Sequence, residues 1–170
     1  MSYGIMPYMV SIDSIKGLFG ISDEELEKML LKKLTPKAIK LEKSFEEPAP
    51  EVLMSFLDGV IVYPHLGYIY WYLIEAMIPY ISGKFMNNGN WYPASLDEFY
   101  ELTSLDCTID IEGLPYPDDF PSLFFCKNQN LSTLRSEVKQ YISDADQQAE
   151  FIDWIEACTN NNKDLILFYY

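Results

Sequence analysis

The sequence predicts an α+β fold: a small, mainly antiparallel sheet that includes both chain termini and packs with about six to eight helices. Two observations lead to this prediction. Apolar side chains alternate at Tyr8, Val10 and Ile12, and the apolar run from Leu165 to Tyr170 has the pattern of a second strand. Most of the sequence between them has apolar residues at helical spacing. Because 170 residues is an ordinary size for one domain, we expect a single domain over residues 1–170.

Helix start signals divide the middle of the chain. Ser22 and Glu25 form a capping-box pattern before a run of apolar residues, which predicts the start of a helix at Ser22. Thr35 followed by Pro36 is typical of an N-cap with proline in the first turn, so we expect a separate helix to begin there. The expected helices cover residues 13–20, 22–34, 35–45, 51–57, 65–78, 95–102, 131–141 and 149–158.

The region between residues 106 and 126 is predicted to be less regular. Ile109 and Ile111 alternate with Asp110 and Glu112, which is a pattern that a half-exposed strand would have. A glycine and three prolines follow before residue 122, so we expect a long surface loop there, and then a short buried strand that ends at Cys126.

The composition is strongly acidic. The chain has 26 acidic and 12 basic side chains, and its formal net charge is −14 at pH 7. Contacts to nucleic-acid phosphates come from Lys and Arg, so we expect no nucleic-acid binding, and the same repulsion opposes binding to anionic membranes. The charge is unevenly placed, because residues 44–126 hold thirteen acidic side chains and Lys84 alone, whereas residues 1–43 have a net charge of +1.

The cysteines and the longest uncharged run bear on localisation. Cys107, Cys126 and Cys158 are odd in number and widely spaced, unlike a disulfide framework, so we expect a reducing, cytoplasmic compartment. Residues 59–74 carry no formal charge, but this run is too short to span a bilayer and is interrupted by Pro64. We expect a buried core helix instead.

Residues that could carry chemistry are few. A zinc site needs about three or four Cys or His ligands, and this chain has one histidine and three scattered cysteines, so we expect no metal. The glycine-rich phosphate motifs do not occur in the sequence, and we expect no cofactor. His65 is the single imidazole that could activate a nucleophile, and Glu75 is a lone carboxylate on an apolar helix. We favour a structural role for both and therefore do not expect an enzyme.

Several segments resemble a known family. They are Met1 to Gly4, Leu18-Phe19-Gly20, His65-Leu66-Gly67-Tyr68, the run Leu114 to Pro121, and Asp164 to Tyr170. In this order they resemble a family of small bacterial proteins classified as a domain of unknown function and, more distantly, the YfbM-like proteins. The resemblance implies a bacterial, cytosolic protein with an α+β fold, and it implies no activity and no catalytic residue.

We expect a protein-binding or regulatory module, which by analogy could be immunity-like, that presents an acidic aromatic surface to a basic protein partner. Prolines stiffen the loop around residues 116–120, aromatic rings supply contact area, and carboxylates attract a cationic surface. The expected binding residues are Trp91, Tyr116, Asp118, Asp119 and Phe120. The alternative is a small enzyme or ligand sensor whose pocket is lined by His65, Glu75 and Trp91. The sequence leaves the oligomeric state open.

Overall fold

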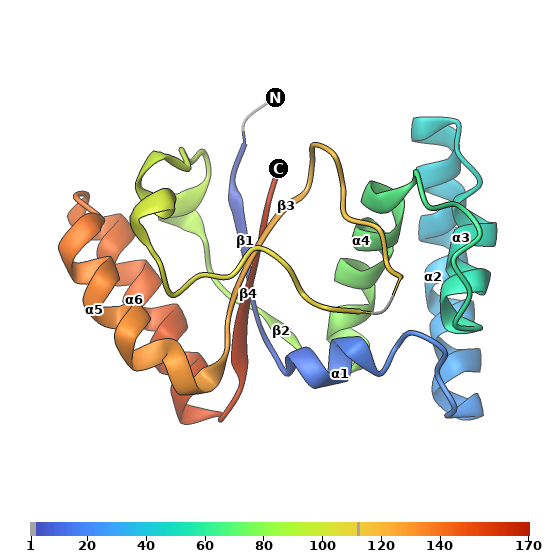
Figure 1. Ribbon diagram of the computed structural model, residues 1–170, viewed down its shortest axis with the longest axis horizontal. Coiled ribbons are helices and arrows are strands. Elements are labelled where there is room, and N and C mark those ends of the chain that lie inside the picture. Colours follow the sequence, from blue (N-terminus) through green and yellow to red (C-terminus); the bar gives the residue numbers. More distant parts are fainter. Residues whose placement is uncertain (1–2, 112) are drawn as a thin grey trace. The chain divides into compact units, whose positions relative to one another are not determined.

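A computed structural model describes residues 3–111 and 113–170 and confirms the α+β fold (Figure 1). The helices of these residues are α1 (Ile12–Lys16), α2 (Glu24–Phe45), α3 (Ala49–Leu57), α4 (Gly67–Met77), α5 (Leu131–Tyr141) and α6 (Ala145–Asn160). The strands are β1 (Ile5–Val10), β2 (Lys84–Phe85), β3 (Ser122–Cys126) and β4 (Asp164–Tyr169). Short 3-10 helices are η1 (Ile78–Tyr80), η2 (Gly89–Trp91), η3 (Asp97–Glu101) and η4 (Asn128–Asn130).

The chain forms two compact units. Residues 1–12, 83–109 and 122–170 form the sheet unit, which contains the four strands together with α5 and α6. Residues 13–82 and 110–121 form the helical unit, which contains most of α1 and all of α2, α3 and α4. The helical unit is thus made of two separate stretches of sequence. The expectation of a single domain stays a prediction.

The sheet has the order β2-β1-β4-β3, and all of its neighbouring strands are antiparallel. Strands near both termini pair in the middle of the sheet, where Tyr8 lies opposite Ile166, so the prediction for the two ends is confirmed. The edge strand β2 has only two residues, both exposed, and the sequence pattern did not predict it. In the sheet unit, α5 and α6 lie over one face of the sheet (Figure 1).

The carboxylate of Asp164 joins three segments of the sheet unit. Its oxygens accept hydrogen bonds of 2.8 Å from the backbone N–H groups of Ile12, where α1 begins, and of Asn128, just after β3. The helix expected at residues 13–20 is the shorter α1, and the acceptor for its first N–H comes from β4. An aspartate at the start of the last strand thus fixes the ends of two other elements.

Aromatic rings fill the core of the sheet unit. Trp91 lies at centroid distances of 5.2 Å from Phe99, 5.8 Å from Phe151 and 5.9 Å from Trp154. The indole N–H groups of both tryptophans donate to backbone carbonyl groups, so no polar atom of these buried rings lacks a partner. This packing explains how two helices and a thin sheet bury such large side chains.

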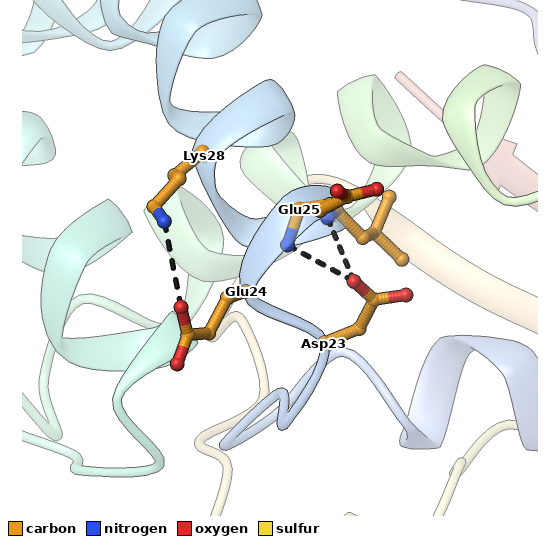
Figure 2. Close-up of polar contacts among 5 residues, drawn as sticks. Asp23, Glu24, Glu25 and Lys28 are labelled. Carbon is orange, nitrogen blue, oxygen red and sulfur yellow. Dashed lines mark hydrogen bonds and ion pairs between the residues drawn. The ribbon is translucent and has the colours of Figure 1, made fainter.

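Helix α2 begins one residue later than the capping-box pattern predicts. Asp23, rather than Ser22, is the N-cap, and its Oδ1 accepts hydrogen bonds of 3.0 Å from the N–H groups of Glu25 and Leu26 (Figure 2). Lys28 forms an ion pair of 3.4 Å with Glu24 one turn before it. The aspartate satisfies two of the free N–H groups that every helix start exposes.

The expectation of a new helix at Thr35 is wrong, because α2, which has 22 residues in all, continues through this position. The Thr35 hydroxyl donates 2.6 Å to the carbonyl of Leu31 instead of capping a following turn. Leu30, Leu34 and Ala38 form one buried stripe that crosses the proline without interruption. Packing of this stripe outweighs the local start signal.

Helices α2, α3 and α4 pack on one another to form the core of the helical unit. Phe56 of α3 contacts Tyr70 of α4, and α4 is buried along most of its length, as the apolar run predicted. Helix α4 begins at Gly67 rather than immediately after Pro64. Residues 60–63, which precede this helix, are not part of a strand.

Two further expectations differ from the structure. The helix expected at residues 95–102 is the short 3-10 helix η3, and Glu98 near its start accepts hydrogen bonds from Ser143. Ile109 and Ile111 are buried but are not in a strand, and Glu112 lies outside the described residues. The short buried strand that ends at Cys126 is confirmed as β3.

Candidate functional site

The proline-rich loop 113–121 is held on helix α4 within the helical unit (Figure 1). The indole N–H of Trp71 donates 3.1 Å to the carbonyl of Pro115, and Trp71 itself is fully buried. The ring of Tyr116 packs on the Trp71 ring at a centroid distance of 5.4 Å. The backbone of Tyr116 also lies against Gly67, which has no side chain to hold it away. The expected surface loop is therefore anchored at its beginning.

Beyond this anchor, the loop turns its acidic residues to solvent. Asp118 and Asp119 are exposed, whereas Tyr116, Pro117 and Phe120 are half-buried. Of the four loop residues that the sequence singled out, the two aromatic ones are therefore half-buried and the two carboxylates are exposed. The loop is thus held at Pro115 and Tyr116 and exposes its two carboxylates.

Three aromatic rings gather beside this loop. Phe45, the last residue of α2, lies at centroid distances of 5.4 Å from Tyr68 and 5.6 Å from Tyr72 on α4. Phe45 is 41% exposed, and both tyrosines are half-buried. Tyr68 and Tyr72 are four residues apart, so they lie on the same side of α4 and can both contact the end of α2.

Carboxylates surround these rings. Burial raises the pKa of Tyr72 above its ordinary value, and the negative charges of Glu75 and Asp119 raise this pKa further. Burial likewise raises the pKa of Tyr68, as do the charge of Glu47 and the hydrogen bond that Tyr68 donates to it. The charges of α4, the α2–α3 turn and the loop therefore act on one set of rings.

We call this region the acidic aromatic surface. It is formed by Phe45, Glu47, Tyr68, Tyr72, Glu75, Asp118 and Asp119. All of these residues belong to the helical unit. A surface of this kind combines partly exposed aromatic side chains with negative charge, which is the chemistry that binds Lys and Arg side chains.

Trp91, expected in both candidate sites, belongs to the sheet unit. It is 1% exposed and packs among Phe99, Phe151 and Trp154. Its indole N–H donates 3.0 Å to the carbonyl of Gln147. The acidic aromatic surface is therefore built without Trp91, whose ring is occupied in the core of the other unit.

His65 and Glu75 both lie in the helical unit, while the third residue of the expected pocket, Trp91, does not. The His65 side chain is exposed, and its ring lies 6.2 Å from that of Tyr63 in an edge contact. Glu75 is half-buried and lies close enough to Tyr72 to raise its pKa. Glu75 and Asp119 of the loop thus both act on the Tyr72 ring.

The sheet unit holds a hollow of about 480 Å³ between β2 and α6. Its wall includes the buried carboxylate of Glu150, which accepts hydrogen bonds of 3.1 Å from the N–H of Gly89 and 2.8 Å from that of Asn90. The Asn87 side-chain amide donates to the same carboxylate. Glu150 thus holds the 87–90 turn in place and has little capacity left for a ligand.

Two of the three thiols are buried. Burial raises the pKa of Cys126 and of Cys158 from 9.0 to about 12, so both remain protonated at neutral pH, and Cys107 is exposed. Across residues 3–111 and 113–170, no three His, Cys, Asp or Glu side chains are grouped so that they could hold a metal ion. No helix within those ranges is long and apolar enough to cross a membrane.

Sequence reasoning found the two exposed carboxylates of the surface but missed its rings. Phe45 lies in a segment that was expected to be helical, and Tyr68 and Tyr72 lie in one that was expected to be a buried core helix. The i, i+4 spacing of the two tyrosines was an available signal for a tyrosine-bearing face. That Phe45 would join them depends on how α2 packs on α4, which no local pattern encodes.

Comparison with known proteins identifies the family of this chain. The model of a family described as "Domain of unknown function (DUF7691)" matches residues 1–170. The chain therefore belongs to the DUF7691 family. Neither the curated proteins nor the solved structures contain a significant match. The expected bacterial origin and the distant YfbM relationship stay predictions.

Proposed function

We propose that this protein is a non-enzymatic binding module, and that a basic protein partner binds to the acidic aromatic surface of the helical unit. The observation that carries the proposal is the convergence of Phe45, Tyr68 and Tyr72 with the charges of Glu75 and Asp119. A Lys or Arg side chain could lie over these rings and pair with a carboxylate in one contact.

The anchored loop favours binding over a purely solvating role. The hydrogen bond from Trp71 to Pro115 and the packing of Tyr116 hold the loop backbone in the free protein. A partner would therefore not have to order the loop, and preorganisation of this kind increases affinity. The exposed carboxylates Asp118 and Asp119 would increase the rate of encounter with a cationic partner.

A regulatory role in a bacterial cytoplasm, immunity-like or otherwise, is the setting that this proposal implies, and it rests on analogy. The nature of the surface supports the general part of the proposal. Aromatic side chains are common in binding hot spots because they bury much area at a small entropic cost. A surface with three rings and several carboxylates is thus suited to a partner rich in Lys or Arg.

The proposal can be tested with an octa-arginine peptide and isothermal titration calorimetry in about 0.15 M salt. We expect Asp118→Lys/Asp119→Lys to weaken peptide binding at least about tenfold, or about 1.4 kcal/mol. The control variant is Glu101→Lys/Asp153→Lys, which changes the net charge equally at two exposed sites in the sheet unit. If both variants weaken binding to the same extent, the peptide senses only total charge and the proposal is wrong.

A further inference from the structure

The helical unit also carries a basic surface. From its middle to its end, α2 has five exposed lysines with Glu42 as the single acidic residue among them. We call these side chains the basic face of α2: Lys32, Lys33, Lys37, Lys40 and Lys43. They make up five of the 12 basic side chains of a protein whose net charge is −14. The basic charge is thus concentrated on one helix.

Among the described residues, no ion pair involves a lysine of the basic face. Lys33, Lys37 and Lys40 are separated by four and three residues, so they form one row along the helix. In the part of the chain that the structure describes, the ion pairs are Lys28–Glu24 and Arg135–Glu156, and neither involves this row. Like charges at such spacing repel each other and destabilise a helix. The row therefore lowers the stability of α2, and the fold of the unit gives no reason for it.

We propose that the basic face of α2 binds the acidic aromatic surface of a second copy of this chain. This inference rests on the proposed function, because it names one basic partner for that surface. Both surfaces belong to the helical unit. Both surfaces include part of α2, since the lysines lie on this helix and Phe45, its last residue, is part of the acidic aromatic surface.

Two surfaces of opposite charge on one unit can pair with each other across a two-fold axis. In such a dimer, Lys33, Lys37 and Lys40 of each copy face Asp118 and Asp119 of the other, so the same contact forms twice. The net charge of the protein repels a second copy, but this repulsion is screened beyond about 8 Å at physiological salt. The charges at the contact itself therefore decide whether two copies bind each other. Self-association and binding of another basic protein would then compete for one surface.

The test is sedimentation velocity at about 0.15 M salt, over concentrations from about 1 µM to 1 mM. We expect the protein to form a concentration-dependent dimer. We expect Lys33→Glu/Lys37→Glu/Lys40→Glu and, separately, Asp118→Lys/Asp119→Lys to be monomeric, because each homodimer would place like charges together. An equimolar mixture of these two variants should dimerise again, because both of its contacts join opposite charges.

The control is Lys84→Glu/Lys127→Glu/Lys139→Glu, which changes the net charge as the α2 variant does but lies in the sheet unit. It should dimerise as the unchanged protein does. A protein that stays monomeric throughout, or a mixture that fails to dimerise, would overturn the inference. A monomeric protein whose α2 lysines instead bind a DNA duplex would overturn it as well. Octa-arginine binding by a monomeric protein would leave the proposed function intact.

Discussion

A Cβ atom added to Gly67 would lie 2.1 Å from the carbonyl oxygen of Tyr116, so the 113–121 loop rests directly on the first turn of α4. The neighbouring atom is backbone and cannot move as a flexible side chain could. This contact and the bond from Trp71 to Pro115 set the position of Asp118 and Asp119. The geometry of the acidic aromatic surface therefore depends on a glycine at this position.

Gly67→Ala should lower the free energy of unfolding by about 1–3 kcal/mol, because the loop backbone must move to admit a methyl group. Urea unfolding measures this change. Gly17→Ala is the control, since its Cβ would meet the Asp13 carbonyl oxygen at an ordinary 3.4 Å. The control should be neutral or slightly stabilising. Equal stability of the two variants would show that the loop does not rest on Gly67.

Phe45→Ala should weaken octa-arginine binding several-fold while lowering the free energy of unfolding by about 1 kcal/mol, because it removes ring contacts with Tyr68 and Tyr72 at an exposed edge. Calorimetry and urea unfolding separate the two effects. Tyr100→Ala removes a ring that is 74% exposed in the other unit and should change neither quantity. Unchanged peptide binding by Phe45→Ala would exclude the rings from the binding surface.

Glu150→Ala should lower the free energy of unfolding by about 2–4 kcal/mol, because the N–H groups of Gly89 and Asn90 and the Asn87 amide would lose their acceptor. Asp153→Ala, on the exposed side of the same helix, should change it by less than about 0.5 kcal/mol. The measurement is again urea unfolding. Similarly small changes in the free energy of unfolding for both variants would mean that water replaces the Glu150 carboxylate as acceptor without loss of stability.

Thiol reactivity should separate the three cysteines. Ellman's reagent at pH 8 should modify Cys107 rapidly in the native protein, because its thiol is exposed. Cys126 and Cys158 should react only after unfolding, since both are buried and their pKa is raised to about 12. Rapid modification of all three thiols in the native protein would contradict the burial of the pair.

The same two thiols make stability depend on alkaline pH. Below about pH 9 each thiol is protonated in both the folded and the unfolded chain. Above this pH the unfolded chain releases the protons while the folded protein retains them up to about pH 12, so the free energy of unfolding falls as pH rises. The fall should approach about 1.4 kcal/mol per pH unit for each thiol. Urea unfolding at pH 8 and pH 10 measures it, and constant stability would contradict the raised pKa values.

The elements that sequence patterns predicted well are those whose signal is local and whose packing agrees with it. Alternation in β1 and the apolar run of β4 predicted both central strands, and the exposed carboxylates of Asp118 and Asp119 followed from a proline-rich loop. At Thr35 the local signal failed. A buried stripe from Leu30 to Ala38 continues past this residue, so the two expected helices are one helix. The two-residue strand β2 exists through pairing with a distant strand, which no window of sequence contains.

The candidate surface was predicted in part for the same reason. Charge and turn residues identified the loop, but the contact of Phe45 with Tyr68 and Tyr72 joins the ends of two helices that are separated in the sequence. Trp91 illustrates the converse case. Its aromatic ring was expected at a binding surface, and it is enclosed by other rings in the sheet unit, because exposure is a property of packing rather than of residue type.

The most direct test of the acidic aromatic surface is a quantitative pull-down from lysate of the native host. The bait proteins are the unchanged chain, Asp118→Lys/Asp119→Lys, and the charge-matched control Glu101→Lys/Asp153→Lys. We predict that a basic protein is retained by the unchanged chain and by the control, and that it is lost from the loop variant. Recovery of the same partners by all three baits would contradict the proposal that this surface binds them.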